Sequence, residues 1–235
     1  WEAPYTPSQP LNMADDARDD DQSLLDKLIA VLLGLPWTTM LSSAYKLIRE
    51  RMGGKPYAGM YEVLEYESTL ELKDRGGKSA TFRKREKVRY LQDNVIAYQD
   101  QAWGDGQILL DYRCTPGTPV DRYRSGHKTY LLISRREVKH KGDVDEFRIQ
   151  WHIRRGFLRT REQWETHVTH RTKRLKINVI FPRSRPPQRV TLIEGDRQRS
   201  HTLKGASLLP DGRRQVTWET RQPRRYENYI LQWEW

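Results

Sequence analysis

The sequence has little cysteine and few apolar residues for its length. Its 235 residues include one cysteine, Cys114, which excludes an intramolecular disulfide framework and a cysteine-rich zinc site. Only 36% of the residues are hydrophobic, whereas 31% are charged. A chain of this length can still bury a sizeable core without covalent links. The apolar residues must then be used economically, on one face of each strand. The cysteine count favours a reducing cytoplasm.

Known catalytic and metal-binding motifs are also missing. The six histidines form no HExxH run, and His167 and His170 are three residues apart, which puts them on opposite faces of a strand. The glycines of residues 103–106 lack the lysine and the following helix of a phosphate-binding loop. We therefore expect no catalytic residue, no metal site and no cofactor.

Positive charge is concentrated in the last third of the chain. The formal net charge is +11, divided as −2 over residues 1–60, +1 over 61–146 and +12 over 147–235. Arginine, which dominates there, favours bidentate contacts with phosphate or carboxylate groups. The alternative interpretation is a solvated face that only aids solubility. The candidate residues for one basic surface that binds an anionic partner are Arg154, Arg155, Arg159, Arg161, Arg171, Lys173 and Arg174.

The N-terminal segment, residues 1–23, is acidic and rich in proline. Prolines interrupt any helix, and a cluster of aspartates repels itself, so we expect this segment to be disordered. Met13 would make a plausible native start, which leaves residues 1–12 as a candidate artefact of the fragment. No signal peptide or arginine-rich transit peptide is evident.

Residues 24–54 are expected to form a helical arm, which Pro36 divides into two helices. Residues 28–45 carry no charge over 18 positions, the lower limit for a membrane span. Three interpretations stay open: a hairpin that packs on the rest of the chain or on a partner, an amphipathic membrane anchor, and a true span within residues 28–48. The candidate docking or membrane residues are Leu28, Ile29, Val31, Leu32, Leu33, Leu35 and Trp37.

From residue 57 onward the hydrophobic period changes to two, the period of strands. The pattern predicts an antiparallel β-sandwich over residues 57–235, immunoglobulin-like in the loose sense, with a β-barrel as the alternative. The longest strand is expected over residues 164–182, and the last over residues 229–235. Alternation along these two stretches nominates the core residues Leu175, Ile177, Val179, Phe181, Tyr229, Leu231 and Trp233.

An apolar arm joined to a basic β domain indicates a non-enzymatic interaction module, such as an adaptor, sensor or effector component. We expect it in the cytoplasm, or at the cytoplasmic face of a membrane, with a protein partner or a second copy of itself. One alternative is nucleic-acid binding by the arginine-rich third, where Trp151, Phe157 and Trp164 could stack on bases. The other alternative is a β-barrel that binds a small molecule or acts as an enzyme.

Overall fold

A computed structural model describes residues 59–235, which belong to the compact unit Gly54–Trp235. The predicted disorder of residues 1–23 and the predicted helical arm of residues 24–54 lie outside the described residues. The described residues are mainly β strand and contain no helix, which confirms the prediction of a mainly β domain. Consequently, no helix within residues 59–235 is long and apolar enough to cross a membrane.

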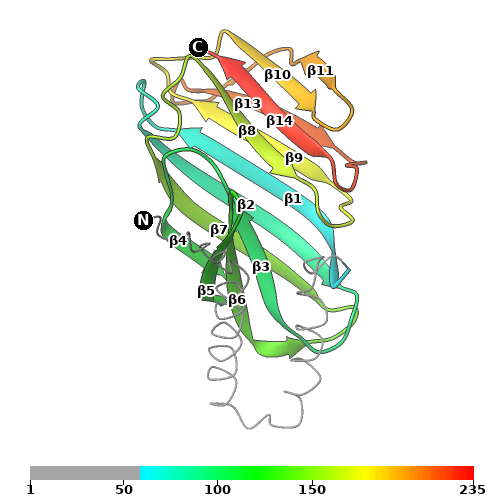
Figure 1. Cartoon of the computed structure of the whole chain (residues 1–235). Helices are drawn as coiled ribbons and strands as arrows, with labels where there is room; N and C mark the ends of the chain where they lie inside the picture. The colour runs from blue at the N-terminus through cyan, green and yellow to red at the C-terminus, as the bar shows by residue number, and fades with distance from the viewer. Residues whose placement is uncertain (1–58) are drawn as a thin grey trace, which may run out of the picture. The chain divides into compact units, whose positions relative to one another are not determined.

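Three sheets make up the described residues (Figure 1). The seven-stranded sheet has the order β12-β13-β9-β1-β2-β7-β4, with the bounds Ser207–Leu208, Arg214–Thr220, Leu175–Phe181, Tyr61–Leu72, Ser79–Tyr90, Val144–Arg154 and Gln107–Thr115. The four-stranded sheet is β11-β10-β14-β8, with the bounds Arg199–Thr202, Arg189–Glu194, Asn228–Glu234 and Arg161–His167. The three-stranded sheet is β3-β6-β5, with the bounds Val95–Ala102, Lys128–Lys139 and Thr118–Ser125. Within this part of the chain no sheet closes on itself, so the barrel alternative is wrong.

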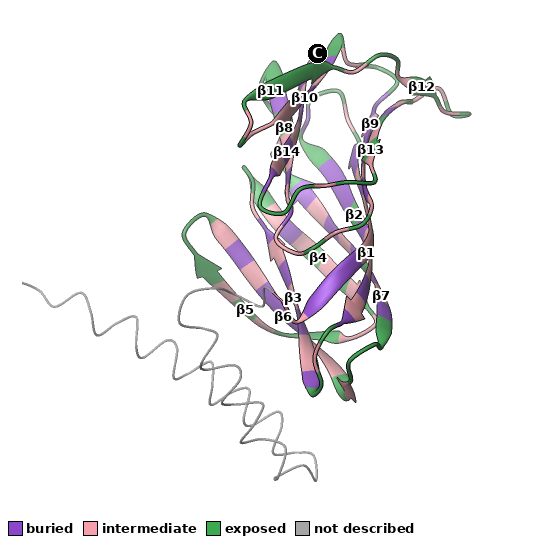
Figure 2. Ribbon diagram, turned by 90° about the vertical axis from the view of Figure 1, so that its right-hand side faces the viewer, coloured by how far each residue is buried: buried purple, intermediate pink, exposed green. Residues whose placement is uncertain are grey.

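The seven-stranded sheet buries one face beneath the two smaller sheets. Trp164 of β8 packs on Phe82 of β2, with ring centroids 4.9 Å apart, and Tyr98 of β3 stacks on Phe147 of β7 at 3.9 Å. The four-stranded sheet thus covers one stretch of this face, and the three-stranded sheet covers another. Figure 2 shows buried positions alternating with less buried ones along the larger strands, whereas β11 is exposed along its length. The core lies between these layers.

The predicted core residues of the last strand and of residues 175–181 are confirmed. Trp233 of β14 meets Phe181 of β9 edge to face, with ring centroids 5.6 Å apart. Alternation places the core residues of β9 on one side of that strand and the core residues of β14 on one side of the other. These two sides face each other across the layers. None is more than 3% exposed: Leu175, Ile177, Val179, Phe181, Tyr229, Leu231 and Trp233.

The prediction of one long strand over residues 164–182 is wrong. The chain leaves the four-stranded sheet after β8 and enters the seven-stranded sheet as β9, so the two strands lie in different layers. The intervening loop is held to β1, since the amide of Val63 donates to the carbonyl of Arg171 at 2.8 Å. The imidazole of His170 also stacks on the ring of Tyr61, with centroids 4.2 Å apart.

Two further details depart from the sequence pattern. Strand β9 pairs with β1 in parallel, so the large sheet is mixed and not wholly antiparallel. Strand β5 includes Pro119, a residue type that is usually excluded from the interior of a sheet. Proline is tolerated in β5 because this strand forms the edge of its sheet, where one row of amides needs no partner.

Candidate functional site

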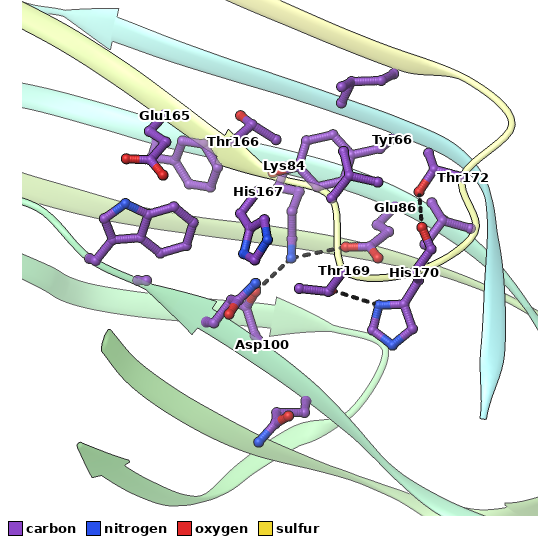
Figure 3. Close-up of a pocket in the computed structure, with 18 of the residues that line it drawn as sticks. Tyr66, Lys84, Glu86, Asp100, Glu165, Thr166, His167, Thr169, His170 and Thr172 are labelled. Carbon is purple, nitrogen blue, oxygen red and sulfur yellow. Dashed lines mark hydrogen bonds and ion pairs between the residues drawn. The ribbon is translucent and has the colours of Figure 1, made fainter. Parts of the chain in front are cut away.

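A cleft of about 110 Å³ opens where the two smaller sheets meet above the large one. One wall is residues 99–103, from β3 and its end, and the other is residues 164–170, from β8 and the loop that follows it. Figure 3 shows Glu165, Thr166 and His167 on one side, Asp100 on the other and Lys84 between them. One water needs roughly 10–15 Å³ of such space, so this β3–β8 cleft has room for several waters or one ligand side chain.

Two charged residues of β2 face the cleft because of their place in the strand. Lys84 and Glu86 alternate in phase with Phe82 and Val88, and all four are buried. Neither charged residue was among the site residues predicted from the sequence. The signal was nevertheless present in the sequence, because a charge in phase with buried apolar residues must be paired inside the core.

The Lys84 ammonium is held between two carboxylates. Its Nζ lies 2.5 Å from Asp100 Oδ1 and 3.0 Å from Glu86 Oε2, and the three side chains are only 3–7% exposed. We call these three residues the Lys84 triad. Burial alone would lower the pKa of Lys84, but the charges of Asp100 and then Glu86 hold that pKa well above its ordinary value. The Lys84 ammonium therefore stays charged at neutral pH, and the formal net charge of the triad is −1.

Phenol groups complete the hydrogen bonding of the triad. Tyr98 accepts from Lys84 Nζ at 3.0 Å and donates its hydroxyl to Glu86 Oε2 at 2.7 Å. Tyr112 donates to Asp100 Oδ2 at 2.9 Å. Burial raises the pKa of both phenols, so both remain protonated donors at neutral pH. The charged groups on the floor of the cleft are thus engaged with one another and with neutral phenols.

A second contact bridges the mouth of the cleft. Lys128 Nζ of β6 lies 3.2 Å from His167 Nδ1 of β8 and 4.6 Å from the ring centroid of Trp103. Burial, followed by the charge of Lys128, lowers the pKa of His167. A neutral imidazole can accept a hydrogen bond from the ammonium through Nδ1. Glu165, two residues before His167, forms no ion pair within 4.0 Å among residues 59–235, although its charge interacts with Lys128 and His167.

The structure separates the seven predicted basic residues into two groups. Arg154, Arg155, Arg159 and Arg161 lie between the end of β7 and the start of β8, whereas Arg171, Lys173 and Arg174 lie in the loop after β8. The seven residues of β8, about 20 Å of extended chain, separate the groups. Four of these side chains have acidic partners: Arg159–Asp105 at 3.1 Å, Arg161–Glu234 at 2.5 Å, Lys173–Glu62 at 3.5 Å and Arg174–Glu219 at 2.8 Å. Their joint binding of an anionic partner stays a prediction.

The apolar docking residues predicted for the arm fall outside the part of the chain that the structure describes. They are Leu28, Ile29, Val31, Leu32, Leu33, Leu35 and Trp37. Their docking to a partner or a membrane stays a prediction as well.

Metal and thiol chemistry find little support in the described residues. Between residues 59 and 235, no group of three or more histidine, cysteine, aspartate or glutamate side chains could hold a metal ion. Burial raises the pKa of the Cys114 thiol to about 12. A thiol is nucleophilic only as the thiolate, so Cys114 is unreactive at neutral pH.

No family model matches the chain, and no curated protein matches it in sequence. Among solved structures, it is similar to an M1 zinc metallopeptidase from Deinococcus radiodurans, with 10% identity and a TM-score of 0.45 over 74% of this chain and 42% of that one. A mutant of an M1 zinc metallopeptidase from the same organism, bound to a Tyr-Ser-Ala substrate, gives 11% identity and a TM-score of 0.46 over 75% and 44%. The chain spans less than half the length of these solved chains. At these values the likeness identifies neither a family nor an activity.

Proposed function

We propose that residues 59–235 form a non-enzymatic interaction module that binds a protein partner in the β3–β8 cleft. The observation that carries this proposal is the position of β3 and β8 in their sheets. Each is an edge strand, and no other described strand pairs with its outer side. The cleft walls are runs of consecutive residues, 99–103 and 164–170, as expected where main-chain edges border a space. An exposed edge offers unpaired amides and carbonyls to a further strand.

The chemistry of the cleft favours binding over catalysis. A general base or nucleophile needs a group that is free to react, with a pKa near the working pH. The Lys84 triad is instead saturated by its own members and by Tyr98 and Tyr112. The remaining lining is rich in aromatic side chains, including Phe82, Trp151 and Trp164, which is typical of recognition pockets.

Three finer points belong to the same proposal. One large sheet covered by two smaller ones supports the description of the domain as a β-sandwich, immunoglobulin-like in the loose sense. The arm of residues 24–54 would serve as a second docking element, for a partner or a membrane. The cytoplasmic location, or the cytoplasmic face of a membrane, stays a prediction that cell fractionation can check.

The experiment asks whether peptide binding depends on an open cleft. The full chain is used to select binders from a display library of random linear peptides, and the binders are then measured against three variants. Thr169→Trp and Gln101→Trp each place a large side chain at one wall of the cleft. Thr217→Trp is the matched control, on an exposed position of β13 away from the cleft.

We expect binders whose affinity falls tenfold or more with either wall variant and stays unchanged with Thr217→Trp. Thermal unfolding of each variant confirms that it is folded. If every selected peptide binds the two wall variants as tightly as the parent protein, the cleft is not the recognition site and the proposal is wrong.

A further inference from the structure

We infer that the partner segment is an extended peptide that pairs with the outer edge of β8 and presents a basic side chain to Glu165. This inference rests on the proposed function, because it names the class of partner for the same cleft. It departs from the expectation of an anionic partner for the basic third of the chain. Main-chain direction, local charge and the aromatic lining of the cleft support it.

The main chain of β8 shows which groups are available. The amide of Val168 donates to the carbonyl of Glu227 at 3.1 Å, and the amide of Trp235 donates to the carbonyl of Thr160 at 3.3 Å. In an antiparallel pair, the main-chain groups of successive residues point alternately toward the partner strand and away from it. The even-numbered residues of β8 therefore bond to β14, and the odd-numbered ones direct their amides and carbonyls outward.

The outward residues within the cleft are Glu165 and His167. Together they offer two amides and two carbonyls, which is enough to pair with a short stretch of a peptide strand. Residues opposite each other in adjacent strands also project their side chains from the same face of the sheet. The peptide residue opposite Glu165 would therefore place its side chain beside the Glu165 carboxylate.

The charge of the cleft is opposite to that of the domain. Residues 61–235 carry 36 lysines and arginines against 23 aspartates and glutamates, a net charge of +13. The lining of the cleft instead contains Lys84 against Glu86, Asp100 and Glu165, a formal net charge of −2 when histidines are not counted. Lys128 at the mouth reduces this to −1; its ammonium contacts His167 and Trp103, and its charge also interacts with that of Glu165. A basic side chain is the complementary one.

The cleft already stabilises one ammonium group in this manner. Lys84 Nζ lies 5.8 Å from the ring centroid of Tyr66 and 5.5 Å from that of Tyr98, in addition to its two carboxylates. Trp103 receives the ammonium of Lys128 in the same way. Aromatic faces attract cations, and they do so more strongly where water is excluded. A lysine or arginine entering beside Glu165 would meet the same kind of surroundings.

Synthetic peptides test the inference directly. The probe is a fluorescent heptapeptide of alternating threonine and valine with a central lysine, and its binding to the full chain is followed by fluorescence anisotropy. Two analogues replace the central lysine with norleucine or glutamate. Two further analogues carry N-methyl groups on every second amide, one for each of the two registers. A peptide paired with β8 presents only one register of amides to that edge.

We expect the lysine peptide to bind at least tenfold more tightly than the norleucine peptide, and the glutamate peptide to bind more weakly still. N-methylation in one of the two registers should weaken binding tenfold or more. Glu165→Gln should remove the preference for lysine over norleucine. Glu219→Gln, the matched control on β13, should leave that preference unchanged.

Two results would overturn the inference. One is a preference for lysine that survives Glu165→Gln, and the other is binding that neither N-methylated register weakens. Library peptides that still lose affinity with Thr169→Trp would then leave the cleft as a recognition site with a partner of different chemistry. If the two wall variants instead bind the library peptides as tightly as the parent protein, the proposed function itself is wrong.

Discussion

Two sites on the β1–β2 pair, one around Lys84 in the middle of β2 and one around Glu71 near the turn, bury charge in opposite ways. In the Lys84 triad one ammonium is held by two carboxylates. Near the turn between the strands, one carboxylate, Glu71, is held by three cations, which we call the Glu71 cluster. Lys73 Nζ lies 2.5 Å from Glu71 Oε1, Arg83 Nη1 lies 2.7 Å from Glu71 Oε2, and Arg213 also binds Oε1.

The carboxylates around the Lys84 ammonium and the cations around the Glu71 carboxylate differ in their exposure to water. The carboxylates of the triad are 3% and 7% exposed, whereas the cations around Glu71 are 31–47% exposed. A buried ion that loses its partner keeps the full cost of desolvation, while an exposed one can turn into water. The triad should therefore be intolerant of substitution. The Glu71 cluster should tolerate the loss of one cation, because the other two still bind the carboxylate.

The largest effect is expected for Lys84→Met. The substitution leaves Glu86 and Asp100 as neighbouring carboxylates without a cation in a buried site, which should cost about 3–5 kcal/mol of unfolding free energy. Urea unfolding measures the loss. Lys87→Met, on the opposite face of the same strand, is the control and should change stability by less than about 0.5 kcal/mol. A loss below about 1 kcal/mol for Lys84→Met would show that water reaches the triad.

A triple substitution separates the value of the triad from the cost of breaking it. Lys84→Met combined with Glu86→Leu and Asp100→Leu removes all three charges at once. Replacing a complete buried ionic group by apolar residues is often nearly neutral, whereas removing one partner is not. We expect the triple variant to unfold at a higher urea concentration than Lys84→Met alone. If the three losses simply add, the groups do not act as a unit.

Period-two alternation was enough to predict the β architecture and the apolar core. Trp233 and Ile177 are buried because of their positions in the alternation of side chains along their strands, and this alternation is a local property of the chain. The break at residues 168–174 could not be predicted, because it depends on long-range hydrogen bonds from Val63 and on the stack between His170 and Tyr61. A local pattern carries no information about which sheet a strand joins.

The candidate site was predictable only in part. The phase of Lys84 and Glu86 with Phe82 was visible in the sequence, but their partner Asp100 comes from a different sheet. The free edges of β3 and β8 follow from strand order, which depends on tertiary packing. The predicted basic residues were chosen by their spacing along the chain, and β8 separates them in space.

An intermediate effect is expected for Glu71→Gln. The amide keeps the shape of the side chain but loses its charge-assisted hydrogen bonds to three cations, which should cost about 2 kcal/mol at pH 7. Burial alone would raise the pKa of Glu71, but hydrogen bonds from Lys73, Arg83 and Arg213 lower it to about 2 from an ordinary value of 4.5. The folded state therefore favours the ionised form.

This shift sets the pH range in which the stabilisation disappears. A group whose pKa is lower in the folded state contributes its full stabilisation at pH values above its pKa in the unfolded state. This contribution to the unfolding free energy declines as the pH falls through the pKa of the folded state. The difference in unfolding free energy between the parent protein and Glu71→Gln should shrink from pH 4.5 toward pH 2. A difference that stays constant down to pH 2.5 would contradict the shift.

The smallest effect is expected for Arg83→Gln. Lys73 and Arg213 still hold Glu71, and the Arg83 side chain is 47% exposed, so its loss should cost less than about 1 kcal/mol. A double-mutant cycle with Glu71→Gln, measured by urea unfolding, isolates the pair and should give a coupling of about 0.5 kcal/mol that decreases in high salt. A loss as large as that of Lys84→Met would mean that the cations around Glu71 act as a buried unit. The contrast between the Lys84 triad and the Glu71 cluster would then be removed.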